Sequence, residues 1–380
     1  MFNIILLGIT SLLTDISSEM VYPLLPIYLV NQLGASPAIL GFIEGIAESS
    51  ASLLKVFSGY FSDRLKLRKP FTILGYAASA AGKLFLYISG GWGLVFFGRL
   101  IDRIGKGVRT APRDALIADS AQAEKRGQAY GLHRTMDTLG AVSGVLLAYL
   151  IITRYKGDFK NVFFISLIPA ALGIIVLFLV REKKREQKVR AAKVEFRWHA
   201  LDRRLKMFLI FTFIFTLGNS SNQFLLLRAK SLGNPLGIVI LLYLFYNITY
   251  CLMAYPAARL SDRIGRKKLL VAGYFIYGLV YLGFALNNSA ANLWLLFGLY
   301  GFYIGFTEGV EKALVVDIAP QGLRATAIGL HAALVGIGLF PASLLAGLLW
   351  KYAGASAPFY FAGFMGITAS IGLWFILKDL

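Results

Sequence analysis

The stretch Gly93–Ser120, GLVFFGRLIDRIGKGVRTAPRDALIADS, joins an apolar beginning to a dense row of charges. If the stretch is a helix with about 100° per residue, most of its charges fall within an arc of about 120°. These are Arg99, Asp102, Arg103, Lys106, Arg109 and Arg113. In hydrocarbon each charge costs at least ~2.5–3.5 kcal/mol, so such a stripe must face a partner helix or a water-filled cavity. The stretch therefore predicts a polar pathway inside a bundle of apolar helices. Alternatively, Pro112 ends the helix early and the second half is a solvated end.

The composition is that of a polytopic membrane protein. The chain has 380 residues, of which 57% are hydrophobic and 16% are charged, and its mean hydropathy is +0.66. Soluble domains have about 45–50% apolar and ~25% charged residues. The start, MFNIILLGIT, has neither a basic region nor a cleavage site of small residues. We therefore expect it to be a retained first helix rather than a signal peptide.

Twelve apolar segments in two sets of six are expected to span the membrane, since a span needs about 20 residues. The first set covers residues 3–30, 37–62, 70–89, 92–119, 127–153 and 160–180. The second set covers residues 205–230, 235–260, 268–287, 291–318, 323–350 and 356–377. The predicted fold is all-α, with two pseudo-symmetric six-helix bundles at residues 1–180 and 205–380. The polar stretch 181–204 is interpreted as a cytoplasmic basic linker.

The net charge of +19 is concentrated in a few short loops rather than in a nucleic-acid-binding patch. The loops after the first, third and ninth predicted helices contain no Lys or Arg. By the positive-inside rule, both termini and the linker are predicted on the cytoplasmic side of the inner membrane, next to its anionic leaflet. No nucleic-acid partner is expected. The single Cys251 excludes an internal disulfide and any metal site built from cysteines.

The two halves of the chain repeat each other. The triplet Ser62–Arg64 recurs at Ser261–Arg263, 199 residues later, and Gly131–His133 recurs at Gly329–His331, 198 residues later. An offset of six helices gives both copies the same orientation, so the repeat is parallel, about an axis along the membrane normal. Proteins of this kind hold a substrate near the midplane between their halves and rock one half against the other.

The loop between the second and third predicted helices reads Gly59-Tyr-Phe-Ser-Asp63-Arg64-Leu-Lys66-Leu67-Arg68-Lys69. It resembles the pattern G-x-x-x-D-R-x-G-R-[KR] of the major facilitator superfamily, with Lys66 and Leu67 in place of glycine and arginine. The second copy, Asp262-Arg263-Ile-Gly265-Arg266-Lys267-Lys268, keeps the glycine and arginine but has Ala258 at the leading glycine position. The likeness covers essentially the whole chain. It implies the twelve-helix fold of that family, and a conformational latch made by Gly59, Asp63, Arg64, Arg68, Asp262, Arg263, Gly265 and Arg266. The alternative is a generic positive-inside loop.

Two further segments resemble motifs of drug- or metabolite-exporting bacterial members of the family. Arg103–Arg109 approximates R-x-x-Q-G-x-G, with Lys106 at the glutamine position. Gly140–Gly144 approximates the antiporter motif G-P-x-x-G but has no proline. The resemblance implies export, and the missing proline leaves the direction of exchange open.

Four carboxylates are the candidates for proton coupling. Asp15 and Glu19 lie one turn apart in the first predicted helix, and Glu44 and Glu48 do so in the second. At 1.5 Å per residue, Asp15 and Glu48 come near mid-membrane, as does Arg99 or Arg103. Opposite charges on three helices can therefore meet as ion pairs. They form either a protonatable site whose pKa responds to the opening of the cavity or a static salt-bridge network.

The remaining candidates are charge partners or substrate contacts. They are Arg99, Asp102, Arg103, Lys106, Arg134, Asp137, Asn219, Asn222, Gln223, Asn247, Glu308 and Glu311. Glu308 and Lys312 have the spacing of a local salt bridge, and His133 and His331 are interpreted mainly as packed, hydrogen-bonded residues. A divalent metal among the carboxylates is disfavoured by the neighbouring arginines, so no metal site is expected.

These features predict a secondary transporter that exports a small organic molecule in exchange for protons by alternating access. A proton symporter or uniporter that imports an organic anion is the main alternative, because cations are abundant in the predicted pathway. A non-transporting membrane receptor is the alternative from another class. An enzyme is not expected, since no H-E-x-x-H, G-x-S-x-G or phosphate-loop motif occurs. The proton gradient is the expected energy source, without a cofactor, and we expect a monomer.

Overall fold

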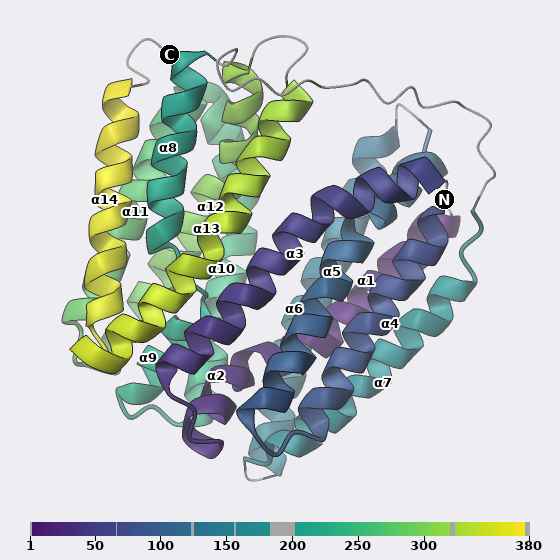
Figure 1. Cartoon of the computed structure of the whole chain (residues 1–380), viewed down its shortest axis with the longest axis horizontal. Coiled ribbons are helices and arrows are strands. Elements are labelled where there is room, and N and C mark those ends of the chain that lie inside the picture. The colour runs from purple at the N-terminus through teal and green to yellow at the C-terminus, as the bar shows by residue number, and fades with distance from the viewer. Residues whose placement is uncertain are drawn as a thin grey trace. The chain divides into compact units, whose positions relative to one another are not determined.

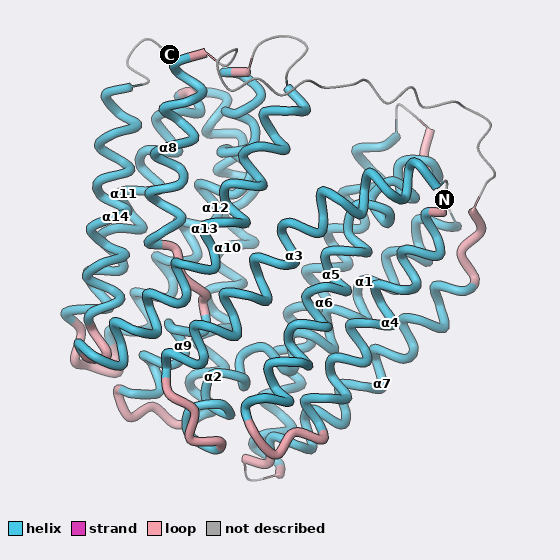
Figure 2. The backbone as a smooth tube through the Cα atoms, viewed as in Figure 1, coloured by secondary structure: helices cyan, strands magenta, loops and turns pink. Residues whose placement is uncertain are grey.

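The computed structural model describes residues 2–65, 67–122, 125–155, 157–182, 202–319 and 324–376. Within these ranges the regular structure is helical and no strand occurs, as the tube of Figure 2 shows. Eight helical segments of the described part are long and apolar enough to cross a membrane. The predicted all-helical membrane fold is therefore confirmed. The charge-bearing α3, α4 and α5 and the interrupted pair α8–α9 lie outside this set of eight.

The helices group into two compact units (Figure 1). Unit 1 comprises Met1–Ala35 and Ile46–Ala191. Its helices are α1 (Phe2–Val21), α2 (Leu25–Ile27), most of α3 (Pro37–Leu65), α4 (Arg68–Tyr87), α5 (Trp92–Ser120), α6 (Arg126–Arg154) and α7 (Phe159–Phe178). The first turns of α3 belong to unit 2.

Unit 2 comprises Ser36–Gly45 and Ala192–Leu380. Its further helices are α8 (Arg203–Gly218), α9 (Gln223–Ser231), α10 (Leu236–Ile264), α11 (Arg266–Leu286), α12 (Asn292–Ile318), α13 (Arg324–Ala353) and α14 (Ala357–Ile376). Most of the predicted linker 181–204 lies outside the described residues.

The first apolar segment is not the single helix expected over residues 3–30. Regular α-helix ends at Val21 and is followed by a 3₁₀ turn, Tyr22–Leu24, by α2 and by a π-helical turn, Tyr28–Gln32. Pro23 and Pro26 lie at the starts of the 3₁₀ turn and of α2. Because proline has no amide N–H and its ring crowds the preceding turn, the regular α-helical ladder cannot continue through them.

The segment expected as one helix over residues 205–230 is also interrupted. α8 ends at Gly218 and α9 begins at Gln223. The four residues between them, Asn219–Asn222, are Asn and Ser, whose side chains compete with the helix for backbone hydrogen bonds. Two of the backbone groups there are satisfied from other helices. Tyr277 donates to the Gly218 carbonyl at 2.9 Å, and the Ser221 amide donates to Ser343 Oγ at 3.1 Å.

Helix α5 continues through Pro112 to Ser120, so an early end at that proline is wrong. It packs closely against α4 through glycines on both helices. A Cβ atom on Gly82 would lie 2.5 Å from the Gly98 carbonyl oxygen, and one on Gly105 would lie 2.4 Å from the Gly75 carbonyl oxygen. The two backbones therefore approach more closely than larger residues allow, which brings the charged face of α5 against α4.

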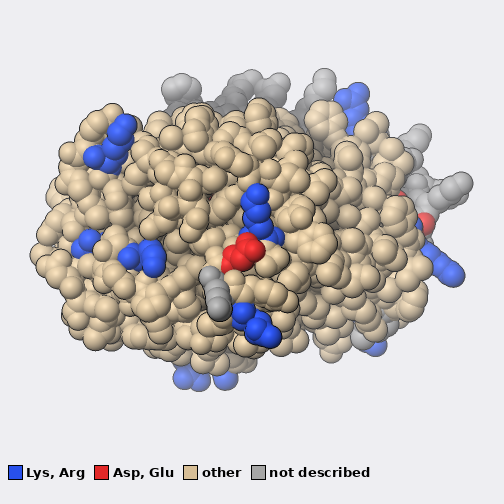
Figure 3. Space-filling view, turned by 90° about the horizontal axis from the view of Figure 1, so that it is seen from below, with Lys and Arg blue, Asp and Glu red and all other residues tan. Residues whose placement is uncertain are grey.

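The outer surface is suited to lipid. On α7, Ile168, Leu172, Ile175 and Phe178 are all about half exposed or more and lie at helical spacing. In water such a row would be unfavourable, whereas hydrocarbon chains contact it without cost. Seen from below the view of Figure 1, at the lower ends of the helices, most surface residues are uncharged, with scattered Lys and Arg side chains and a small acidic group among them (Figure 3).

Candidate functional site

The charged stripe of α5 lies inside unit 1, where the sequence predicted it. Arg99, Asp102, Arg103 and Arg109 are buried, whereas Lys106 on the same helix is exposed. Burial of several charges in one helical unit is tolerated only where they are paired.

Glu48 of α3 is the centre of this pairing. Its Oε1 lies 3.0 Å from Arg103 Nε and 3.7 Å from Arg99 Nη2. Arg99 also reaches Asp102, with 3.4 Å between Nη1 and Oδ2. Both guanidinium groups lie over the ring of Tyr22, at 5.6 Å and 5.9 Å from its centroid. Helices α3 and α5 thus meet through opposite charges, and an aromatic face from the first segment supports both arginines.

The carboxylate of Asp15 lies in the same interior. Asp15 is half-buried on α1, and its Cβ atom is 3.1 Å from the place where a side chain on Gly140 would begin. Its charge interacts with those of Asp137, Glu19, Lys106 and Arg109. The coupling candidates Asp15 and Glu19 therefore share their surroundings with the cations of α5.

Lys83 of α4 belongs to this network although the sequence analysis did not single it out. Its side chain is only 2% exposed, and its Nζ atom makes no hydrogen bond to a protein group. The charge of Asp102 acts on it most strongly among its neighbours. The sequence feature that could have pointed to Lys83 is a single Lys within an otherwise apolar membrane span.

Arg109 is held on the α4 side of the network by two contacts. It donates to Ser79 Oγ, and its guanidinium lies 4.5 Å from the centroid of the Tyr76 ring. Ser79 Oγ in turn donates to the Asp102 carbonyl at 3.0 Å. The position of the Arg109 charge is therefore fixed by α4.

Glu44 is separated from Glu48 although the two lie one turn apart on α3. Glu44 is 0% exposed and accepts a hydrogen bond from Ser221 Oγ at 3.3 Å within unit 2. Glu48 pairs with arginines of unit 1. The two carboxylates thus have partners in different units.

In unit 2 the candidate polar residues lie among buried tyrosines. Asn222 accepts from the Tyr300 hydroxyl at 2.5 Å and donates to the Tyr246 hydroxyl at 3.3 Å. The neighbouring Gln223 is fully buried, and neither polar atom of its amide has a hydrogen-bond partner among the residues that the structure describes. Asn247 donates to Tyr243 in its own helix at 2.8 Å. Asn219 is half-buried at the interruption between α8 and α9.

The other titratable candidates have local partners. Glu308 accepts from the Tyr250 hydroxyl, and Glu311 lies 2.6 Å from His331 Nε2. In unit 1, Asp137 lies 3.6 Å from His133 Nδ1, and Arg134 is exposed. The two contacts of unit 2 join α10 and α13 to α12, whereas the pair of Asp137 and His133 lies within α6. No group of three or more potential metal ligands occurs among the described residues.

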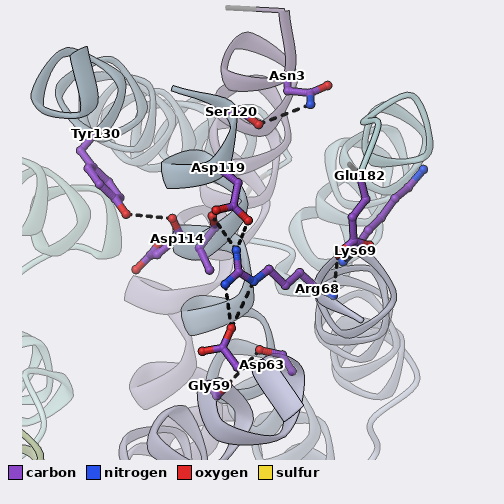
Figure 4. A network of polar contacts seen from close by, with 12 residues as sticks. Asn3, Gly59, Asp63, Arg68, Lys69, Asp114, Asp119, Ser120, Tyr130 and Glu182 are labelled. Carbon is purple, nitrogen blue, oxygen red and sulfur yellow. Dashed lines mark hydrogen bonds and ion pairs between the residues drawn. The ribbon is translucent and has the colours of Figure 1, made fainter. Parts of the chain in front are cut away.

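Near the start of α4, Arg68 lies between two carboxylates, those of the latch candidate Asp63 and of Asp119 (Figure 4). Arg68 Nη2 lies 2.7 Å from Asp63, at the end of α3, and Nη1 pairs with Asp119, at the end of α5. Nη1 also donates to the Ala115 carbonyl at 3.3 Å. The backbone amides of Arg68 and Lys69 donate to the Glu182 carboxylate at 2.9 Å and 3.1 Å. One arginine thus joins three helices.

Unit 2 contains the equivalent arrangement around Arg266. Its Nη1 lies 2.6 Å from Asp317 and 3.2 Å from the Ala313 carbonyl, and Nη2 lies 3.8 Å from Asp262. Gly265 before it has a φ of 94°, a conformation that glycine adopts without strain. Its counterpart Lys66 lies outside the described residues.

The remaining latch candidates have different surroundings. Gly59 lets α3 approach α5, because a Cβ on it would lie 3.2 Å from Ala111 Cβ. Arg64 and Arg263 are exposed.

Comparisons with a family model and with related sequences both point to one family of membrane transporters. The family model described as "Major Facilitator Superfamily" matches residues 7–221 and 207–379. An uncharacterised MFS-type transporter of Methanocaldococcus jannaschii is 40% identical, with 98% of this chain and 94% of the relative covered. The multidrug resistance protein MdtH of Enterobacter sp. (strain 638) is 26% identical, with 96% and 92% covered.

Solved structures with the same fold include two transporters. The nucleoside transporter NupG has a TM-score of 0.81 at 14% identity, with 100% of both chains covered. A D-xylose–proton symporter has a TM-score of 0.73 at 20% identity, with 98% of this chain and 97% of that chain covered. At these identities the likeness establishes the architecture alone.

Proposed function

The chain belongs to the major facilitator superfamily of membrane transporters, and from this premise we propose that it is a proton-coupled secondary transporter. It moves a small organic molecule across the cytoplasmic membrane by alternating access. The two moving bodies are residues 1–180 and 205–380, joined by the linker 181–204, and both termini are cytoplasmic. A monomer suffices for this cycle.

The observation that carries the proposal is the buried network of Glu48 with Arg99 and Arg103. Ion pairs inside a membrane unit are unfavourable compared with apolar packing, so they are retained where they act in transport. Glu48 is shared by two guanidinium groups at 3.0 Å and 3.7 Å. Protonation of such a carboxylate releases its arginines, and this exchange can accompany the change of conformation.

Four carboxylates have defined places in this scheme. Asp15 and Glu19 share the interior of unit 1 with Lys106 and Arg109, Glu48 holds the arginines, and Glu44 contacts Ser221 in unit 2. We assign the proton-binding role first to Asp15, because no arginine contact fixes it at ion-pair distance in the described residues. Arg68 and Arg266 act as latches that hold the ends of their helices together.

Export is the proposed direction. It is supported by the relative named a multidrug resistance protein, which aligns over nearly the whole chain. Import of an organic anion together with protons is the second candidate, and the buried cations Lys83, Arg99 and Arg109 favour it.

The test is proton flux in proteoliposomes that contain the purified protein. A pH gradient is imposed, organic anions, cations and zwitterions are added in turn, and Asp15→Asn and Glu48→Gln are compared with wild type. A ligand-triggered proton movement that one variant abolishes supports coupling, and its sign separates exchange from co-transport. Ligand flux without proton movement would indicate a uniporter, and binding without flux would indicate a receptor.

A further inference from the structure

Lys83 is a charged side chain in the interior of unit 1 whose Nζ atom has no hydrogen-bond partner among the described residues. The side chain is 2% exposed, and none of the three N–H donors of its ammonium makes a hydrogen bond within the described part of the chain. A buried charge in this condition is strongly unfavourable. A ligand that supplied an acceptor to the ammonium would remove this cost.

The carboxylates near Lys83 do not supply a hydrogen-bond acceptor for its ammonium. Asp102 has the strongest electrostatic effect on Lys83, but its Oδ2 atom faces Arg99 Nη1 at 3.4 Å. Asp15 acts on Lys83 more weakly than Asp102 and Arg109 do. The ammonium is therefore attracted by carboxylates without being bonded to one.

Cations reinforce the positive charge around Lys83. Arg109 and Arg103 both act on it. Arg109 is kept in place by Ser79 and by the ring of Tyr76, so it cannot turn away from an incoming ligand. A small anion entering this part of unit 1 would thus meet several fixed positive charges.

Lys106 is the exposed cation of the charged stripe on α5. It lies one helical turn beyond Asp102 on this helix. Asp15 interacts electrostatically with both Lys106 and Lys83. Lys106 and Lys83 therefore both act on one carboxylate, that of Asp15, and belong to one electrostatic neighbourhood.

We propose that Lys83, with Arg109 and Lys106, forms a subsite for an oxyanion group, carboxylate or phosphate, of the molecule that binds to unit 1. Charge-assisted hydrogen bonds from the ammonium satisfy its donors and hold the anion. This proposal depends on the proposed transport function in one respect: the bound molecule is a substrate only if the protein transports it. Binding at Lys83 can be measured without transport.

The experiment measures thermal unfolding of the purified protein in detergent with three probes. Benzoate presents a carboxylate, glucose 6-phosphate presents a phosphate, and tetraphenylphosphonium is an organic cation, all at matched ionic strength. A ligand that binds the folded state raises the unfolding temperature with its concentration. We expect at least one of the two oxyanion probes to do so and the cation not to. The two anionic probes also distinguish a carboxylate from a phosphate site.

The variants separate the charge of Lys83 from its structural effect. Lys83→Gln should weaken binding of the effective oxyanion about tenfold or more, and Lys83→Arg should retain most of it. Lys83→Met, which removes an unbonded buried charge, should unfold at the same or a higher temperature than wild type without ligand. Lys160→Gln, the same change at an exposed position of α7, should leave binding unchanged.

Two results would overturn the subsite: neither oxyanion probe stabilises the wild type, or Lys83→Gln binds the effective probe as tightly as wild type. Proteoliposome flux keeps the two proposals distinct. Oxyanion binding that depends on Lys83 without any flux supports the subsite and contradicts transport. Flux of the cation with no oxyanion binding contradicts the subsite and supports transport.

Discussion

Arg68 and Arg266 occupy equivalent positions in the two units, 198 residues apart in the sequence. Each pairs through Nη1 with the last carboxylate of a neighbouring helix, Asp119 for Arg68 and Asp317 for Arg266. Each also donates from Nη1 to the carbonyl of the alanine four residues before that carboxylate. The repeat read from the sequence thus extends to individual hydrogen bonds.

The two latches should contribute unequally to stability. The side chain of Arg68 is 12% exposed and that of Arg266 is 32% exposed, so solvent screens the second pair more. Arg68→Gln should lower the free energy of unfolding by about 1–3 kcal/mol, and Arg266→Gln by less than about 1 kcal/mol. Chemical unfolding in detergent measures both, with Arg154→Gln at an exposed site as control. Equal losses for Arg68 and Arg266 would contradict this ranking.

The Glu48 network should behave as a coupled unit. Glu48→Gln leaves Arg103 and Arg99 without their shared carboxylate, and we expect a loss of about 2 kcal/mol or more, moderated because Glu48 is 30% exposed. Arg103→Gln should have a similar effect. The double variant should lose clearly less than the sum, because each single variant already removes the interaction between Glu48 and Arg103. Additive losses in the double-mutant cycle would mean that the pair contributes no interaction energy.

The ion pairs of unit 1 could be predicted because helical spacing and depth restrict which charges can meet. Glu48, Arg99 and Arg103 all lie near mid-span on amphipathic faces, and the structure brings them together. Lys83 was not predicted as part of the network, because a single charge has no periodic pattern. Only the packing of α4 against α5 shows that its side chain is buried. The proline and Asn-Ser interruptions were missed because average hydropathy ignores backbone hydrogen bonds.

Helical spacing alone could not predict which residues Glu44 and Glu48 contact. They lie four residues apart on one helix, and the sequence names both as candidates for proton coupling. Glu44 belongs to unit 2 and Glu48 to unit 1, because the first turns of α3 are part of unit 2 and the rest of the helix is part of unit 1. Which neighbour a helix turn contacts depends on tertiary packing, for which one sequence contains no direct signal.

Asp15→Asn should separate proton coupling from substrate movement. The substitution keeps the size of the side chain and removes its negative charge from the vicinity of Lys106 and Lys83. Substrate exchange at equal pH should remain within a few-fold of wild type, whereas accumulation driven by a pH gradient should fall at least about tenfold. Asp158→Asn, at the start of α7, serves as control because Asn also caps a helix. Undiminished pH-driven accumulation would leave Asp15 with a structural role.

Gln223 and Asn222 are neighbours that should respond oppositely to the same change. Gln223→Leu removes an amide that has no hydrogen bond, so the free energy of unfolding should stay within about 1 kcal/mol of wild type or rise. Asn222→Leu removes the hydrogen bonds that Asn222 makes with the hydroxyls of Tyr300 and Tyr246 and should cost about 1–3 kcal/mol. Chemical unfolding of both variants in detergent tests this. A larger loss for Gln223→Leu than for Asn222→Leu would contradict it.

The contact between α4 and α5 should tolerate no added methyl group at Gly82. A Cβ there would lie 2.5 Å from the Gly98 carbonyl oxygen and 2.8 Å from the Asp102 amide nitrogen, both backbone atoms that cannot turn away. Gly82→Ala should therefore cost about 1–3 kcal/mol or more and displace Asp102 from Arg99. Gly131→Ala on α6, where nothing lies within 4 Å of the new atom, should be neutral or stabilising by up to about 1 kcal/mol. Unfolding in detergent compares them, and because Asp102 adjoins Lys83, Gly82→Ala should also weaken oxyanion binding. If Gly82→Ala were as stable as Gly131→Ala, the close approach of the two helices would not determine the position of the charged network.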